Sequence, residues 1–199
     1  MRRLILVRHA PTTATRSFAL PADEPLDEAG RDAAIAFGRW ARTWSGETLS
    51  SPLVRCRQTA AAAGLPTVRV TAELAECDFG GWAGRTLAEI CADDPAACRA
   101  WMTDPLVGPP GGECLDEFST RIGGWLDDQA RRDGDALAIT HGGVVKAAVI
   151  HVLGAPLDAF WRVEVTPLAI TELHSHDGRW TLARVNDHGP PGDGWLSCS

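Results

Sequence analysis

Two short apolar runs, Leu4-Ile5-Leu6-Val7 and Leu137-Ala138-Ile139-Thr140, decide the fold of this chain. The first run ends abruptly in Arg8-His9-Ala10, and the second ends in His141-Gly142-Gly143. Each has the length and composition of a strand buried in a parallel sheet. In an open α/β sheet, ligands bind just beyond the carboxyl ends of such strands. We therefore expect an arginine and two histidines at one sheet edge, where they would form a cationic pocket for a phosphate group.

The composition is that of one globular domain. The chain has 199 residues, of which 45% are hydrophobic and 23% charged, and this length supports a single core. No apolar run is long enough to cross a membrane, and Leu4–Val7 is too short for a signal peptide. The net charge of −7 argues against nucleic-acid or membrane-surface partners. These features predict a cytoplasmic protein, and they leave its oligomeric state open.

The cysteines fit neither a disulfide framework nor a zinc site. They contain no C-x-x-C pair and lie at Cys56, Cys77, Cys91, Cys98, Cys114 and Cys198. We expect reduced thiols, most of them small apolar residues of the core.

Strands and helices are expected to alternate along the chain. Strands are predicted at 3–7, 48–50, 68–70, 135–140, 160–165, 168–173 and 180–185. Helices are predicted at 27–44, 52–63, 87–91, 95–102, 113–132 and 142–153, with 10–25 a loop and 186–199 an irregular tail. The helix at 27–44 is expected to bury a face that includes Ala29, Ala33, Ile35, Ala36, Phe37 and Trp40. The fold class is therefore α/β, a three-layer α/β/α sandwich around a mostly parallel sheet.

The chain offers a candidate for each requirement of phosphoryl transfer. That reaction needs a nucleophile in line with phosphorus, cations on the phosphoryl oxygens and an acid for the leaving oxygen. Arg55 comes one turn into a helix that follows a strand, so the positive end of the helix adds to its charge. Glu76 lies in a glycine-rich loop able to cover the pocket. Together with Arg8, His9 and His141, these residues form the candidate site.

Five segments, in order, resemble those of the histidine phosphatase superfamily, which also contains the cofactor-dependent phosphoglycerate mutases. They are Arg8-His9-Ala10, Ser50–Ala60, Leu74–Gly84, Gly111–Cys114 and Thr140–Gly143. The first alone is a weak signal, but five ordered segments are a strong one. The resemblance implies a phosphoglycerate mutase-like fold with one domain over 1–199, a substrate-covering insertion at about 71–112, and no metal or other cofactor.

The resemblance also implies a role for each residue. His9 would form a phosphohistidine, while Arg8, Arg55 and His141 would bind the phosphoryl oxygens. Glu76 would protonate the leaving alkoxide and then activate the water that cleaves the intermediate. We therefore expect a bell-shaped pH–rate profile centred on the acidic side of neutral. Further substrate contacts are expected from Thr15, Arg16, Trp82 and Gly142.

Several positions leave two interpretations open. The departures from the family's pattern are Ala10 for glycine, Pro11 for an acidic residue, Thr15 for asparagine and Lys146 for arginine. The Thr15 hydroxyl is still able to donate to phosphate, whereas Lys146 fits a helix surface. Trp82, like Trp101, either walls the pocket or packs in the core, and Arg16 either reaches the substrate or lies in solvent.

The reaction and its substrate also have alternatives. The compact chain favours hydrolysis of a small phosphorylated metabolite over a mutase reaction, because mutases carry extra segments that exclude water. Residues 8–12, 76–82 and 109–113 resemble α-ribazole phosphatases of cobalamin biosynthesis, and a broad-specificity sugar- or glycerate-phosphate phosphatase fits as well. The presence of 71–112 disfavours a phosphohistidine protein phosphatase. The complete set of five site residues disfavours a non-catalytic phosphate-binding module.

Overall fold

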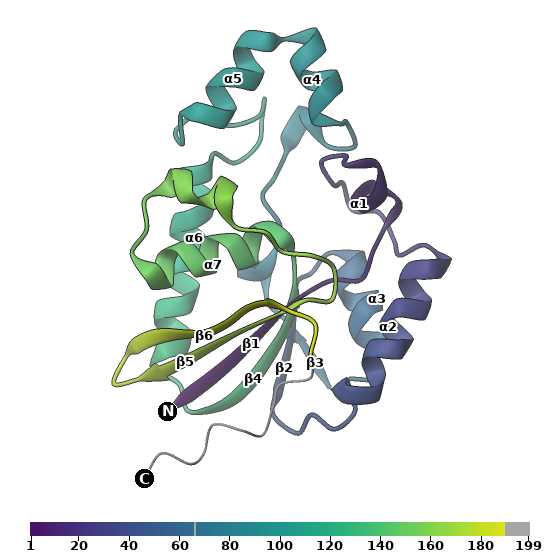
Figure 1. Cartoon of the computed structure of the whole chain (residues 1–199), viewed down its shortest axis with the longest axis vertical. Coiled ribbons are helices and arrows are strands. Elements are labelled where there is room, and N and C mark those ends of the chain that lie inside the picture. Colours follow the sequence, from purple (N-terminus) through teal and green to yellow (C-terminus); the bar gives the residue numbers. More distant parts are fainter. Residues whose placement is uncertain (66, 190–199) are drawn as a thin grey trace.

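A six-stranded sheet lies at the centre of the computed structural model, which describes residues 1–65 and 67–189 (Figure 1). The strands are β1 (Arg2–Arg8), β2 (Glu47–Ser50), β3 (Val68–Val70), β4 (Gly134–Thr140), β5 (Ile170–His176) and β6 (Arg179–Asp187). Their order is β3-β2-β4-β1-β5-β6, in which the first four are parallel and the last two antiparallel. The predicted mostly parallel sheet is confirmed.

The two runs that predicted the fold are adjacent strands. β1 pairs with β4 in parallel, from Arg2 opposite Gly134 to Arg8 opposite Thr140. Beyond the last pair, the backbone N–H of His9 donates to the carbonyl of Thr140 at 2.8 Å. The register therefore delivers His9 and His141 to the same sheet edge.

Helices cover both faces of the sheet. α2 (Glu28–Ala41) and α3 (Val54–Ala62) pack on one face, whereas α6 (Leu115–Ala130) and α7 (Gly142–Leu153) pack on the other (Figure 1). Within β1, Leu4 and Leu6 belong to the core under α6 and α7, while Ile5 and Val7 belong to the core under α2 and α3. A one-residue slip would exchange these two sets, so burial on both faces fixes the register. The three-layer arrangement is thus confirmed.

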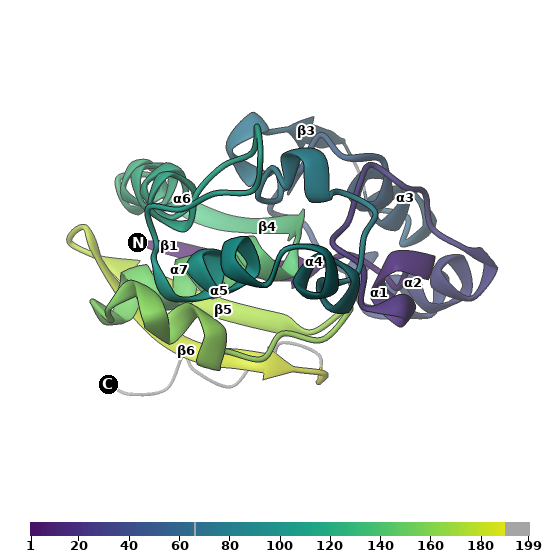
Figure 2. The same cartoon turned by 90° about the horizontal axis from the view of Figure 1, so that it is seen from above.

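Short elements lie above the sheet, between residues 71 and 112. They are the 3₁₀ helices η1 (Ala72–Leu74) and η2 (Gly80–Trp82), followed by α4 (Leu87–Asp93) and α5 (Pro95–Thr103). Seen from above, α4 and α5 lie over the sheet (Figure 2). A disulfide joins Cys91 in α4 to Cys98 in α5, which corrects the expectation that every thiol is reduced. The turn between the two helices brings these Cα atoms to 5.1 Å, a proximity that spacing along the chain does not reveal.

Three predicted boundaries were wrong. The expected loop at 10–25 contains α1 (Thr13–Ser17), which begins with a capping box between Thr12 and Thr15. Residues 160–165, expected as a strand, lie largely in a 3₁₀ helix, η3 (Leu157–Arg162), because Phe160 packs into the core while its neighbours stay exposed. β6 continues to Asp187, so it includes the start of the expected tail, and residues 190–199 lie outside the described residues.

The buried face of α2 also differs from the expectation. Small residues, Gly30, Ala34, Gly38 and Ala41, form this face, whereas Ile35 is 51% exposed. Gly30 and Gly38 lie against the carbonyls of Pro11 and Ala63, where a Cβ would collide. Close approach of two backbones, rather than burial of large side chains, therefore orients this helix.

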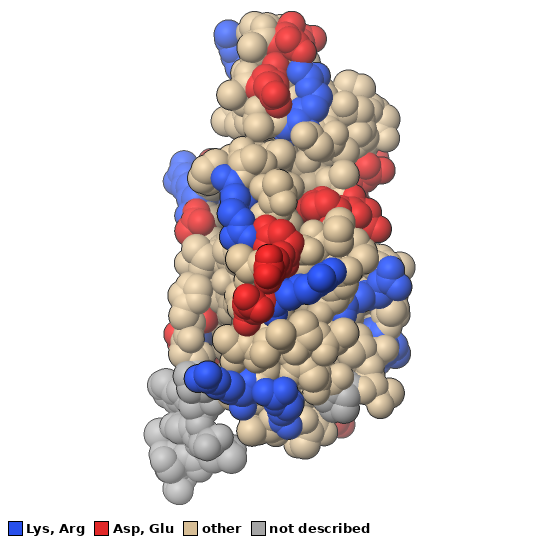
Figure 3. Space-filling model, turned by 90° about the vertical axis from the view of Figure 1, so that its right-hand side faces the viewer, with Lys and Arg blue, Asp and Glu red and all other residues tan. Residues whose placement is uncertain are grey.

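The surface carries both signs of charge. Acidic and basic side chains are interspersed on the face shown in Figure 3. No helix in the described ranges, 1–65 and 67–189, has the length and apolarity needed to cross a bilayer.

Candidate active site

A cavity of about 240 Å³ opens beyond the carboxyl ends of β1 and β4. Five of the predicted site residues line it, namely Arg8, His9, Thr15, Glu76 and Gly142. Arg55 and His141 are fully buried and contact the cavity residue His9 or each other from behind. The sheet edge therefore brings together the two histidines, the two arginines and the acid that the sequence predicted.

His9 is buried, and both of its ring nitrogens have partners. Nδ1 donates to the carbonyl of Ala10 at 2.7 Å, and Nε2 accepts from Nε of Arg55 at 3.2 Å. These contacts assign the proton to Nδ1 and leave a lone pair on Nε2. Burial, reinforced by the charge of Arg55, lowers the pKa of His9 to about 3. The ring is thus a neutral nucleophile at neutral pH.

Arg55 links His9 to His141 and to the segment before α2. Nη2 of Arg55 donates to Nδ1 of His141 at 3.1 Å, and Nη1 donates to the carbonyl of Ala22 at 2.6 Å. Nε2 of His141 donates to Oγ of Ser51 at 2.7 Å. Burial and the charge of Arg55 lower the pKa of His141 well below its usual value. Two neutral histidines therefore flank one buried cation.

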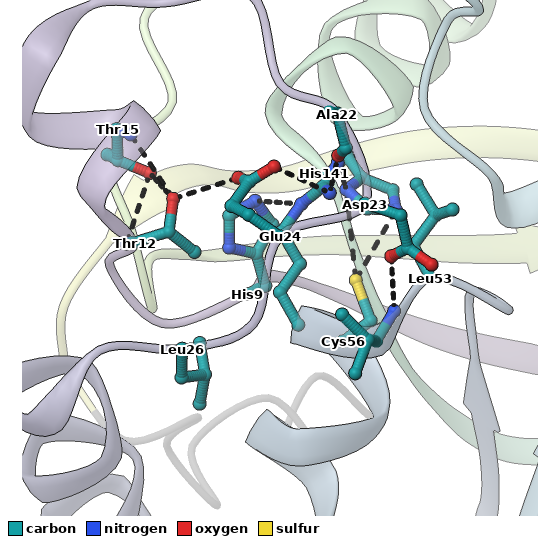
Figure 4. Close-up of polar contacts among 12 residues, drawn as sticks. His9, Thr12, Thr15, Ala22, Asp23, Glu24, Leu26, Leu53, Cys56 and His141 are labelled. Carbon is teal, nitrogen blue, oxygen red and sulfur yellow. Dashed lines mark hydrogen bonds and ion pairs between the residues drawn. The ribbon is translucent and has the colours of Figure 1, made fainter. Parts of the chain in front are cut away.

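Two acidic residues near Arg55 were missed by the sequence reasoning. Oε1 of Glu24 accepts from Thr12 at 3.0 Å, and its Oε2 lies 3.7 Å from Nη1 of Arg55 (Figure 4). That Oε2 atom is buried and makes no hydrogen bond within the described residues. Asp23 accepts from the backbone N–H of Val54, at the first turn of α3, at 2.7 Å. Residues 22–24 thus occupy donors that could otherwise bind phosphate; the acidic pair before Pro25 was the available signal.

Arg8 has an unused donor beside the cavity. Its Nη1 donates to the carbonyl of Val165 at 2.6 Å, whereas its buried Nε makes no hydrogen bond within 1–65 and 67–189. The guanidinium lies against Gly142, the first residue of α7. Burial lowers the pKa of Arg8, and the nearby Glu76 opposes this shift. Arg8 is therefore a cation with a free N–H at the point where a phosphoryl oxygen would lie.

Glu76 is held at the start of α7. Its Oε1 accepts from the backbone N–H of Cys77 at 3.1 Å, and its Oε2 accepts from that of Gly143 at 3.2 Å. A Cβ on Gly143 would collide with this carboxylate, so glycine is required here. The geometry places an acid beside the cavity, across from the buried Arg55.

The loop that carries Glu76 is fastened by Arg121, which the sequence reasoning did not single out. Nη1 of Arg121 donates to the carbonyls of Glu73 and Ala75 at 2.6 and 3.0 Å. The same guanidinium pairs with both carboxylate oxygens of Glu113 at 3.0 and 2.8 Å. The Glu113 and Arg121 side chains therefore position the acid from outside the cavity.

Two predicted substrate contacts lie elsewhere. Arg16 forms an ion pair with Asp27, the N-cap of α2, and does not line the cavity. Trp82 is buried in a small apolar cluster with Ile90, and it is Trp101 that reaches the cavity. The described residues contain no group of three or more side chains suited to hold a metal ion.

The fold and the site together define an α/β protein built to hold a phosphoryl group beside a neutral histidine. The chain belongs to the histidine phosphatase superfamily (branch 1), whose family model matches residues 4–188. This confirms the predicted family.

Three relatives illustrate the range of similar proteins. The chain is 32% identical to a bifunctional protein of Mycobacterium tuberculosis over 206 residues, which cover 94% of this chain and 54% of that protein. It thus spans about half the length of the first curated relatives that it matches. Among solved structures, a mycobacterial glucosyl-3-phosphoglycerate phosphatase with VO3 is 28% identical, with a TM-score of 0.82 and coverage of 94% and 100%. The α-ribazole phosphatase from Shigella flexneri is 25% identical, with a TM-score of 0.80 and coverage of 93% and 96%.

Proposed function

We propose that this chain hydrolyses a small phosphomonoester, without a metal, through a phosphohistidine on His9. The observation that carries the proposal is the orientation of the His9 ring, whose Nδ1 is held by Ala10 while Nε2 faces Arg55. A neutral imidazole with its lone pair beside a guanidinium suits attack on phosphorus, because the cation stabilises the oxygens as the new bond forms. Relatives named as phosphatases support this reaction class.

The reaction would take place in two steps. In the first, Nε2 of His9 attacks phosphorus, the bond to the leaving oxygen breaks, and Glu76 donates a proton to that oxygen. In the second, Glu76 takes a proton from water as the water attacks the phosphohistidine, so that phosphate leaves and Nε2 regains its lone pair. Arg55 would exchange its contacts with Ala22 and Glu24 for contacts with the phosphoryl oxygens.

α-Ribazole 5′-phosphate, an intermediate of cobalamin biosynthesis, is the first candidate substrate. Aromatic side chains line the cavity beyond the candidate catalytic residues, including Phe79, Trp101, Phe160 and Trp161, and they suit a flat ring. The similar fold of the Shigella flexneri enzyme supports this choice. A broad-specificity sugar- or glycerate-phosphate phosphatase is the second candidate, which the mycobacterial relative favours.

The first test is release of phosphate in the presence of a chelator. The panel contains α-ribazole 5′-phosphate, phosphoglycerates, sugar phosphates and phenyl phosphate, each assayed with the wild type and with His9→Ala. We expect release by the wild type and a loss of at least about 10⁴-fold in the variant. An alkaline quench followed by mass spectrometry should detect phosphate on His9. Equal release by the variant would refute the proposed nucleophile, and transfer to a second ester instead of water would indicate a mutase.

A further inference from the structure

Lys146 is the only lysine of the chain, and it lines the cavity beyond the candidate catalytic residues. The side chain is half-buried in α7, and its ammonium lies 5.4 Å from the centre of the Phe160 ring. Across residues 1–65 and 67–189 it takes part in none of the ion pairs, which elsewhere engage most of the arginines. A half-buried cation in an apolar cavity is therefore left without a protein counter-charge in direct contact.

The position of Lys146 relates it to the phosphoryl site. Gly142 begins α7 and lies against the guanidinium of Arg8. Lys146 is one helical turn further along, which corresponds to about 6 Å along the axis. Arg8 and Lys146 thus both line the cavity at successive turns beside one helix. A ligand with its phosphoryl group at Arg8 would meet the ammonium several atoms away.

Two carboxylates lie near Lys146, and neither is bound to it. Glu76 is held by the backbone N–H groups of Cys77 and Gly143. Glu164 also lines the cavity, but its side chain is exposed to water. Burial lowers the pKa of Lys146, and the more distant charge of Glu164 opposes that shift. An anion on the ligand would offset the desolvation that no protein group in contact offsets.

Aromatic rings occupy the same part of the cavity. The ring centres of Trp101 and Trp161 are 5.1 Å apart, and those of Phe160 and Trp161 are also 5.1 Å apart, each pair packed edge to face. All three rings line the cavity, as Lys146 does. This wall suits an apolar body of the size of one ring, carried between the phosphate and a second charged group.

We propose that Lys146 determines specificity by binding a carboxylate on the leaving group. The preferred substrates would then be phosphomonoesters in which an apolar, ring-sized body carries a carboxylate at the end away from phosphorus. This inference rests on the proposed function and narrows it. α-Ribazole 5′-phosphate has the ring but no carboxylate, so it would be a poorer substrate than an acid of similar size.

The test compares 4-(carboxymethyl)phenyl phosphate with its neutral carboxamide, in which a methylene group insulates the reacting oxygen from the changed substituent. We expect the wild type to favour the acid by about tenfold in kcat/KM, mainly through KM, because the contact is a charge-assisted hydrogen bond. Lys146→Met should bring this ratio close to one, and Lys146→Arg should largely retain it. Arg162→Met removes an exposed cation of η3 that pairs with Asp158 outside the cavity, and it should leave the ratio unchanged.

Two further measurements keep this inference separate from the proposed function. Hydrolysis of phenyl phosphate reports on the reaction itself, whatever the ratio of acid to amide. Calorimetric binding of both esters to His9→Ala, alone and combined with Lys146→Met, gives the same ratio where turnover is abolished. An acid preference that disappears with Lys146 supports the proposal, even if the chain does not hydrolyse esters. The absence of a preference, or one that persists in Lys146→Met, would overturn it.

Discussion

Two groups of residues face the same cavity, and they are built in different ways. The cradle, which consists of Arg8, His9, Arg55 and His141, follows directly from strand ends and the helix after β2, and its side chains are deeply buried. The cap, which consists of residues 71–112 and 157–162, is made of 3₁₀ turns and short helices whose rings meet from distant positions in the chain. The difference teaches that sheet register fixes the chemistry, whereas the packing of short elements shapes the space for the leaving group.

The largest expected effect comes from breaking the junction between these two groups at Gly143. In Gly143→Ala, the new Cβ would displace the Glu76 carboxylate while leaving His9 and Arg55 in place. We expect kcat for an alkyl ester to fall about 100-fold, as for loss of a general acid. Hydrolysis of 4-nitrophenyl phosphate should fall much less, because that leaving group needs little protonation.

Gly124→Ala is the matched control for this change. Gly124 is exposed in α6, and an added Cβ would meet no atom within 4 Å. The substitution should leave both rates unchanged and stabilise the helix by about 1 kcal/mol, as seen in thermal unfolding. Equal losses for the alkyl and the nitrophenyl ester in Gly143→Ala would show that the change disturbs the cradle rather than the acid.

A smaller loss is expected when the cap-side support of Glu76 is removed. Arg121→Met deletes the donors to the carbonyls of Glu73 and Ala75 and leaves Glu113 unpaired. We expect kcat for an alkyl ester to fall about tenfold with little change in KM, because the acid remains but is less well positioned. Arg131→Met, which removes an exposed arginine at the end of α6, should have no effect on either constant. An increase in KM alone would assign Arg121 to substrate binding instead.

The same comparison explains what could be predicted from the sequence. β1 and β4 are apolar throughout their buried lengths, so their identity and their pairing follow from burial alone. Once the two strands are parallel, the residues after them must lie together, and His9 and His141 were placed correctly for this reason. The cradle is therefore readable because its geometry is a consequence of one register.

The cap lacks such a rule. Trp82 and Trp101 have similar surroundings in sequence, and only the arrangement of α4, α5 and η3 decides which one reaches the cavity. Arg16 was expected near the substrate, but α1 directs it to the N-cap of α2. These side chains are positioned by contacts between segments that are far apart in sequence, which periodicity and local propensity do not encode.

A still smaller effect is expected from trimming the cap at Trp101. Its ring packs edge to face against Trp82 and Trp161, at 5.6 and 5.1 Å between centres. Trp101→Leu should raise KM for phenyl phosphate about fivefold, in line with the loss of an aromatic contact, and should change KM for glycerol phosphate less than twofold. Trp44→Leu alters a tryptophan on the opposite face of the sheet and should leave both values unchanged. Equal changes for both esters in Trp101→Leu would mean that the cap acts on the phosphate rather than the leaving group.

The smallest expected effect concerns the dependence of stability on pH, which should separate the cradle from the cap. The pKa of His9 falls to about 3 in the folded protein, whereas a histidine in the unfolded chain titrates near 6.5. Between these values the unfolded chain binds more protons, so the free energy of unfolding decreases as pH falls. His9→Asn removes this contribution, although the lowered pKa of His141 leaves part of the trend. Thermal unfolding at pH 7 and pH 5 should therefore give a decrease in Tm that is smaller in His9→Asn than in the wild type by about 3 °C. Trp101→Leu leaves the titrating rings of the cradle in place and should retain the wild-type decrease; an equal decrease in His9→Asn would show that the His9 ring is not buried as a neutral group.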